Sequence, residues 1–155
     1  MLERADGTQY SLAGYKYAKP NQDAKKYSKK TYKEKALPKK VDLTTLMTPV
    51  ENQEQSNSCV ANAVAGAYEY LAKQHLEEDY NVSRMFIYYN ARYLAEDDDD
   101  YEIKDNGSYI QKAIEGLQEY GACSEEMYAF DLDLINDCLL YTSDAADEED
   151  SVDLG

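Results

Sequence analysis

Residues 49–64, PVENQEQSNSCVANAV, place a cysteine where a polar loop passes into an alanine-rich stretch. Apolar residues then recur at helical spacing, which predicts a helix beginning near Ser58, a suitable N-cap. The predicted buried face consists of Val60, Ala63, Val64, Ala67, Tyr68 and Leu71. Cys59 would lie in the first turn, where unpaired N–H groups and the helix dipole favour the thiolate, the nucleophilic form of cysteine.

Acyl transfer by a thiolate also needs donors aimed at the developing oxyanion. Gln53 lies six residues before Cys59, across a tight polar loop, and could supply a side-chain amide beside the Cys59 N–H. The alternative for Cys59 is a small buried apolar residue, the common state of an isolated free cysteine. Cys123 has no base or oxyanion donor nearby in sequence and is predicted to be structural.

Two further helices are predicted. One starts at Ser83, with Phe86, Tyr89 and Tyr93 on one face. The other follows Ser108 and stops at Gly121. Its predicted core stripe is Ile110, Ala113, Ile114, Leu117 and Tyr120. The acidic run at 96–102 is predicted to be a solvated loop, because its consecutive aspartates lack the alternating ligand spacing of a calcium loop.

Composition indicates one globular domain, since 155 residues with 43% hydrophobic side chains contain no run long enough to span a membrane. The N-terminus lacks the apolar core of a signal peptide, and localisation stays open. Three scattered cysteines form neither a disulfide framework nor a metal-ligand pattern.

The net charge of −15 divides into +7 for residues 1–40 and −22 for residues 41–155. Such a basic arm could bind nucleic acid or an anionic membrane, but without a base-reading module it is predicted to be a solvated leader.

The order of several short motifs resembles the start of the mature domain of papain-like cysteine peptidases of the bacterial type. These motifs are Leu37-Pro38, Val41-Asp42-Leu43, Pro49-Val50, Asn52-Gln53, Ser58-Cys59 and Ala61-x-Ala63, and the resemblance extends to about residue 130. It implies an α+β family fold of which this chain holds the mostly helical N-terminal lobe, with a long central helix, two or more shorter helices and little strand. It also implies peptide-bond hydrolysis through a Cys59 acyl-enzyme, with Gln53 in the oxyanion hole.

The resemblance implies further site residues. Of the glycine pair that brings the substrate backbone close, Gly107 would match the first and Ser108 would replace the second. Tyr109 and Ile110 would border an apolar specificity pocket, with Ser58 beside the nucleophile. The implied partners are a peptide or protein substrate and the missing C-terminal lobe of the same enzyme, with no cofactor, metal, nucleic acid or membrane. There are departures: Ser56 stands where many members have a disulfide cysteine, Val60 where tryptophan is usual, and Glu54 where glycine is common.

A base is missing from the pattern. The family's histidine and asparagine lie about 130 to 150 residues beyond the cysteine, whereas 96 residues follow Cys59. The single histidine, His75, is sixteen residues along the same predicted helix, about 24 Å away at ~1.5 Å per residue. The chain would therefore be an inactive lobe lacking the catalytic His and Asn.

The predicted division is a basic, poorly ordered leader at 1–40, a helical lobe at 41–137 and an acidic tail at 138–155. The tail begins CLLYTSDAADE, which resembles the translation of an adapter used in sequencing libraries, and is predicted to be artefactual and disordered. Two other functions stay open: a non-catalytic interaction or inhibitor-like lobe, and another cysteine acyl-transferase such as a transglutaminase-like enzyme. The missing base histidine and the sequence around it, read from the complete gene, would distinguish them.

Overall fold

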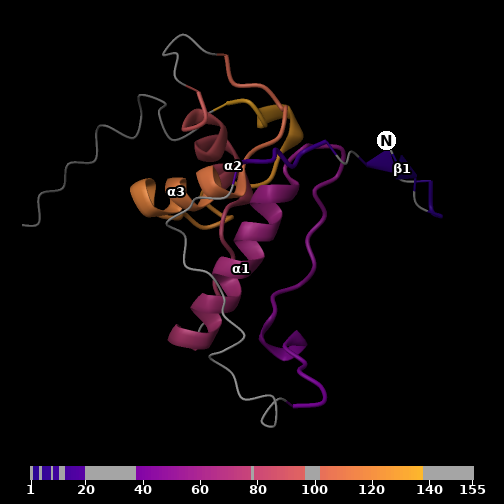
Figure 1. Cartoon of the computed structure of the whole chain (residues 1–155), viewed down its shortest axis with the longest axis vertical. Helices are drawn as coiled ribbons and strands as arrows, with labels where there is room; N and C mark the ends of the chain where they lie inside the picture. Colours follow the sequence, from indigo (N-terminus) through magenta and orange to yellow (C-terminus); the bar gives the residue numbers. More distant parts are fainter. Residues whose placement is uncertain are drawn as a thin grey trace, which may run out of the picture.

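Three helices make up most of the regular secondary structure in the computed structural model, which describes residues 2–3, 5–7, 9–10, 13–19, 38–77, 79–96 and 102–137. Figure 1 shows the long α1 (Cys59–Leu76) running diagonally below the shorter α2 (Arg84–Tyr93) and α3 (Ile110–Tyr120). The smaller elements are β1 (Leu2–Glu3), β2 (Gln9–Tyr10), η3 (Thr44–Leu46) and η4 (Leu132–Leu134). β1 and β2 pair antiparallel, with Leu2 opposite Tyr10. Among the described residues the regular secondary structure is thus mostly helical with little strand, as predicted.

The helix boundaries agree with the sequence prediction. α1 begins at Cys59 directly after Ser58, and α2 begins after Ser83, whose side chain accepts a hydrogen bond from the Phe86 amide. α3 ends at Gly121, which has a positive φ of 74° and whose N–H donates to the Leu117 carbonyl. Capping residues and glycine therefore located these ends correctly.

The predicted buried face of α1 was wrong. Val60 is buried as expected and Val64 is half-buried, but the helix turns Ala61, Ala65 and the carboxylate of Glu69 inward. The other predicted members, Ala63, Ala67, Tyr68 and Leu71, are exposed. α2 packs directly against α1, and small residues allow a closer approach than tyrosine or leucine would. Glu69 is accommodated because it accepts hydrogen bonds from Thr48 and from the Val82 amide.

The faces of α2 and α3 were predicted only in part: Ala113 lies in the core, and Leu117 and Phe86 pack against it. In α3 the side toward α2 is formed by Ala113 and Gly116, while Ile110 and Ile114 remain 45% and 46% exposed and Tyr120 is exposed too. A Cβ at Gly116 would lie 3.2 Å from the Asn90 Cβ, so the two helices cross closely there. In α2 the core residues are Met85, Ile87, Tyr88 and Ala91, whereas Phe86 and Tyr89 are half-buried and Tyr93 is exposed.

The core and two buried arginines hold the loops that surround the head of α1. The core consists of Val60, Ala61, Ala65, Val82, Met85, Ile87, Tyr88, Ala91, Ala113, Tyr128 and Ile135. Arg92 reaches from α2 to the carbonyls of Lys104 and Ile135, and its guanidinium lies 3.8 Å from the Tyr88 ring centroid. Arg84 pairs with Glu51 and Glu125 at 3.0 and 3.1 Å. Within the described ranges, no helix is long and apolar enough to cross a membrane.

Candidate active site around Cys59

Cys59 is the first residue of α1, and a network of short polar side chains holds the loop before it. Ser58 occupies the N-cap position, but its side chain caps no backbone N–H; this detail of the prediction was wrong. The Ser58 hydroxyl instead lies 2.6 Å from the Ser56 hydroxyl and accepts a bond from Asn62 Nδ2. Ser56 in turn donates to the Gln53 carbonyl. The fully buried serines therefore tie the loop to itself and to α1.

The Cys59 thiol is half-buried and protonated rather than held as an anion. Burial raises the pKa of the thiol, and this effect exceeds the opposing effect of the backbone N–H groups of Cys59 and Val60, which lower it. The N–H groups at the helix terminus thus favour the thiolate as expected, but in this conformation burial outweighs them and the net shift of the Cys59 pKa is upward. The helix dipole is present, but the sulfur is too poorly solvated for it to prevail.

Gln53 lies in the same loop, with its carboxamide directed at the Ser56 carbonyl. Its Nε2 donates to that oxygen at 2.9 Å, and since an amide nitrogen carries two N–H groups, this bond uses one of them. The next residue, Glu54, has a left-handed φ of 53°, a conformation that glycine adopts without strain. This explains in physical terms why glycine would suit the position that Glu54 fills.

The N-terminal segment 13–19 lies across the head of α1, where Figure 1 shows the indigo trace passing the start of the helix. We call residues 13–19 the leader segment. Tyr15 forms a parallel β-bridge with Ser108. The Ser108 amide donates to the Gly14 carbonyl at 2.9 Å, and the Lys16 amide donates to the Ser108 carbonyl at 3.0 Å. The leader segment therefore pairs with Ser108 as one strand pairs with another.

Gly14 brings this backbone into contact with the nucleophile candidate. A Cβ on Gly14 would lie 2.8 Å from Cys59 Sγ and 2.2 Å from the Asn57 carbonyl oxygen, closer than real Cβ contacts. Gly107, with a φ of 84°, faces Gly14 from the other side, where a Cβ would come within 2.4 Å of the Gly14 carbonyl oxygen. Because Gly14 and Gly107 have no side chains, the backbones at residues 14, 57 and 107 can come together beside Cys59 Sγ.

The remaining predicted site residues surround the same place. Ser108 is buried, whereas Tyr109 is half-buried and Ile110 exposed. The Lys16 ammonium lies 5.7 Å from the Tyr109 ring centroid and donates to Asn106 Oδ1. The structure therefore gathers Cys59 and Ser108 around the leader segment, with Gln53 and Ser58 in the loop before Cys59 and Tyr109 and Ile110 directly after Ser108.

Several residues that shape this site were not predicted. Gly14 lies in a basic leader whose composition indicated only a solvated arm, and Asp105 was one acid among many. The Asp105 carboxylate accepts the Asn57 amide and the Tyr88 hydroxyl. The run Asp-Asn-Gly at 105–107 has turn character, which was the available signal.

Other candidate groups lie away from Cys59. His75 is exposed near the far end of α1, sixteen residues along one continuous helix, so it stays about 24 Å from the thiol. Cys123 is half-buried, and burial raises the pKa of its thiol too. Within the described ranges, no three His, Cys, Asp or Glu side chains gather as a metal site. Residues 97–101 of the acidic run and the tail 138–155 lie outside the described residues.

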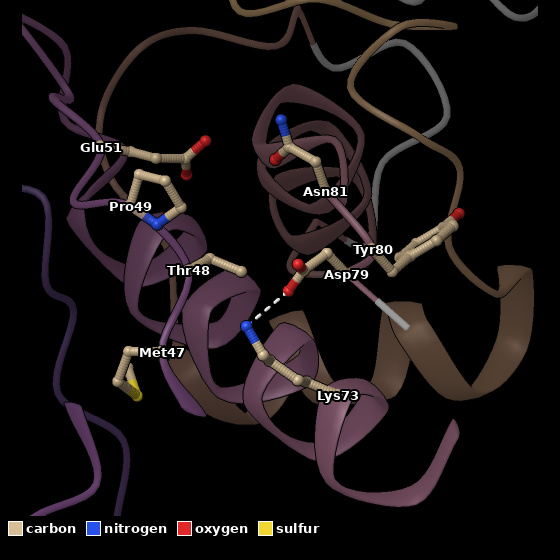
Figure 2. A pocket seen from close by; sticks show the side chains of 8 residues that line it. All are labelled: Met47, Thr48, Pro49, Glu51, Lys73, Asp79, Tyr80 and Asn81. Carbon is tan, nitrogen blue, oxygen red and sulfur yellow. Dashed lines mark ion pairs between the residues drawn. The ribbon is translucent and has the colours of Figure 1, made fainter. Parts of the chain in front are cut away.

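A cavity of about 290 Å³ opens beside the C-terminal half of α1, and Figure 2 shows the side chains that line it. They are Met47, Thr48, Pro49, Glu51, Lys73, Asp79, Tyr80 and Asn81. A Lys73–Asp79 ion pair of 2.6 Å closes one side. None of the predicted site residues lines this cavity, so it is separate from the site at Cys59.

No protein-family model matches the chain, but individual proteins and structures do. Over 96 residues it is 36% identical to an uncharacterized peptidase C1-like protein of Acanthamoeba polyphaga mimivirus, a match covering 61% of this chain and 29% of that protein. Xylellain, a cysteine protease from Xylella fastidiosa, superposes with a TM-score of 0.57 at 30% identity, covering 84% of this chain and 46% of xylellain. The chain has a papain-like fold. The papain-like resemblance read from the sequence is therefore confirmed for the fold.

A second structural match agrees on the papain-like fold. A chain from a structure of the mite allergens Blo t 1 and Der p 1 gives a TM-score of 0.57 at 23% identity, covering 70% of this chain and 34% of that one. The papain-like chain described here spans less than half the length of each of these proteins.

Proposed function

We propose that this chain supplies the nucleophile-bearing helical lobe of a cysteine peptidase that hydrolyses peptide bonds. The observation that carries the proposal is the leader segment itself: an extended backbone pairs with Ser108 while Gly14 lies against Cys59 Sγ. A groove that accepts one stretch of polypeptide in this way has the hydrogen-bonding edge that a peptide substrate needs.

The chemistry follows from the groups at the head of α1. The Cys59 thiolate attacks the peptide carbonyl carbon, and the carbonyl oxygen takes up the negative charge. The Cys59 N–H and the Gln53 amide donate to that oxyanion, for which Gln53 would exchange or extend its present bond to Ser56. The amine then leaves with a proton, and water hydrolyses the thioester.

Proton transfer requires a base from outside this chain. His75 is the single histidine in the sequence, and its distance along α1 excludes it. We propose that the histidine and its orienting asparagine belong to a second lobe that packs against the exposed apolar side chains of α1. The exposed apolar side chains of Tyr68 and Leu71, 38% and 50% exposed, support such a contact.

Peptide hydrolysis by the protein expressed from its complete gene tests this function. Cys59→Ser should abolish cleavage of a fluorogenic peptide, whereas Cys123→Ser should retain it, because both thiols are half-buried but only Cys59 faces the groove. Activity that survives in Cys59→Ser refutes the proposal.

A non-catalytic binding lobe is the second candidate. It is favoured by the protonated state of Cys59 and by the distance of His75. This candidate predicts no peptide cleavage by the protein from the complete gene, together with alkylation of Cys59 no faster than that of Cys123 after the leader segment is displaced.

A further inference from the structure

One carboxylate joins the two sides of the groove that holds the leader segment. Asp105 accepts the Asn57 backbone N–H with both oxygens, at 2.9 and 3.2 Å, and its own carbonyl accepts from Asn57 Nδ2 at 2.9 Å. Asn57 and Asp105 are 48 residues apart in the sequence. Three contacts between two residues so distant fix the position of one loop against the other.

Tyr88 extends this connection to Gly107, on the side of the groove that carries Ser108. Its side chain is fully buried in α2; the hydroxyl donates to Asp105 Oδ1 at 2.6 Å and accepts from the Gly107 N–H at 3.0 Å. Burial, followed by the hydrogen bond to Asp105, raises the pKa of Tyr88 well above its usual range, so the phenol keeps its proton. The hydroxyl is therefore a permanent donor to the carboxylate and leaves a lone pair for Gly107.

The bonded backbone groups lie next to the functional atoms. Asn57 comes two residues before Cys59, and its carbonyl oxygen is one of the atoms that confine Gly14. Gly107 immediately precedes Ser108, whose amide and carbonyl pair with the leader segment. Cys59 and Cys123 are free thiols, so within the described part of the chain no disulfide joins these loops.

We propose that Asp105, oriented by Tyr88, is a positioning residue that sets the spacing between Cys59 and the pairing edge at Ser108. The inference rests on the proposed function of the groove, because that spacing decides where a bound peptide backbone meets the sulfur. Asp105 itself contacts neither the sulfur nor the bound backbone through any bond described here; it acts through Asn57 and Gly107.

Asp105→Asn separates this role from simple packing, because the two side chains have nearly the same volume. The amide carries no negative charge. With its oxygen in the place of Oδ1, which accepts from both the Asn57 N–H and the Tyr88 hydroxyl, it puts an NH₂ group where Oδ2 now accepts the Asn57 N–H at 3.2 Å. Tyr88→Phe removes only the hydroxyl bridge and leaves the ring in the core. Asp133→Asn, at an exposed position, is the matched control.

The experiment uses the full chain and measures two things. The first is alkylation of Cys59 and Cys123 by iodoacetamide and by an epoxysuccinyl dipeptide, followed by mass spectrometry. The dipeptide needs the Ser108 edge, whereas iodoacetamide does not. The second is hydrogen exchange of the Lys16 amide, which the Ser108 carbonyl protects in this structure.

Loss of a hydrogen bond to a charged group typically weakens an interaction by about tenfold or more. In Asp105→Asn we expect the ratio of dipeptide to iodoacetamide rates at Cys59 to fall about tenfold, and protection of the Lys16 amide to fall similarly. Tyr88→Phe should show a smaller fall, and the double variant should be no worse than Asp105→Asn alone, because the hydroxyl acts through the carboxylate. Cys123 rates and Asp133→Asn should match the wild type.

The inference is overturned if Asp105→Asn and Tyr88→Phe leave both the ratio and Lys16 protection unchanged, or if Cys123 rates change in parallel with Cys59, which would indicate general loosening. Should Asp105→Asn fail to fold, the Tyr88→Phe result decides. If Cys59 shows no more preference for the dipeptide than Cys123 does even in Gly14→Ala, in which the added Cβ displaces the leader segment from the Ser108 edge, the proposed function fails. Lys16 exchange then still decides whether Asp105 positions the groove.

Discussion

Gly14→Ala should release the leader segment from Cys59. The added Cβ would lie 2.2 Å from the Asn57 carbonyl oxygen, while real Cβ atoms essentially never come within 3.0 Å of another heavy atom. The neighbour is backbone held by Asp105, so the leader segment must move, by about 0.8 Å from the difference of those two distances. Its second clash, 2.8 Å from Cys59 Sγ, lies on the same side of the groove.

Such a shift disrupts the two hydrogen bonds to Ser108, of 2.9 and 3.0 Å. At about 0.5–1.5 kcal/mol each, their loss is about 1–3 kcal/mol, or roughly 5- to 150-fold in the population of the displaced segment. Release also reduces the burial that raises the Cys59 pKa, so the pKa falls and more thiolate is present at neutral pH. Both effects increase the rate of alkylation.

The assay is the rate of iodoacetamide modification of Cys59 as a function of pH, with Cys123 as the internal reference. We expect at least a fivefold faster reaction of Cys59 in Gly14→Ala and a pH midpoint displaced downward. Gly66→Ala is the matched control, because nothing lies within 4 Å of a Cβ there. A Cys59 rate in Gly14→Ala equal to that of the wild type and of Gly66→Ala would refute the reasoning.

Three further predictions concern stability and are measured by urea unfolding. Glu77 ends α1 with a left-handed φ of 58°, so Glu77→Gly should raise the free energy of unfolding by about 0.5–1 kcal/mol; a decrease would contradict this. Arg84→Met leaves the Glu51 and Glu125 carboxylates without their partner and should cost about 3 kcal/mol, whereas a neutral result would show that the pairs are dispensable. The folded-state pKa of Tyr88 is raised above the unfolded value, so its contribution is complete below pH ~10 and is lost as the pH rises further. Stability should thus fall between about pH 10 and 11 more steeply in the wild type than in Tyr88→Phe, and equal slopes would contradict this.

The local features of the sequence predicted the helix ends and the place of the nucleophile candidate. Ser58, Ser83 and Gly121 act within one turn of their own position, so their meaning does not depend on the rest of the fold. The same applies to Cys59 at the start of α1. Such features depend on neighbouring residues alone, so they can be identified from a single sequence.

The buried faces could not be predicted in this way, because periodicity identifies an apolar stripe but not its partner. In α1 and α3 the larger apolar residues repeat at helical spacing, yet the buried positions include Ala65 and Gly116, and α3 comes close to Asn90 of α2 at Gly116. Only the crossing of two helices shows that a small side chain is required. The exposed side chains of Tyr68 and Leu71 on α1, and of Ile110 and Ile114 on α3, are then apolar surface available to another part of the protein.

The state of Cys59 was mispredicted for a related reason. The helix terminus is a local property and was read correctly, but the burial that raises the thiol pKa depends on groups distant in sequence, among them Gly14. The leader segment brings the polypeptide backbone to the place where a substrate would bind, and it does so with a residue that has no side chain. A bound leader segment and an ionised sulfur are therefore competing states in this chain; under the proposed peptidase function, a substrate must displace the leader segment before the thiolate can attack.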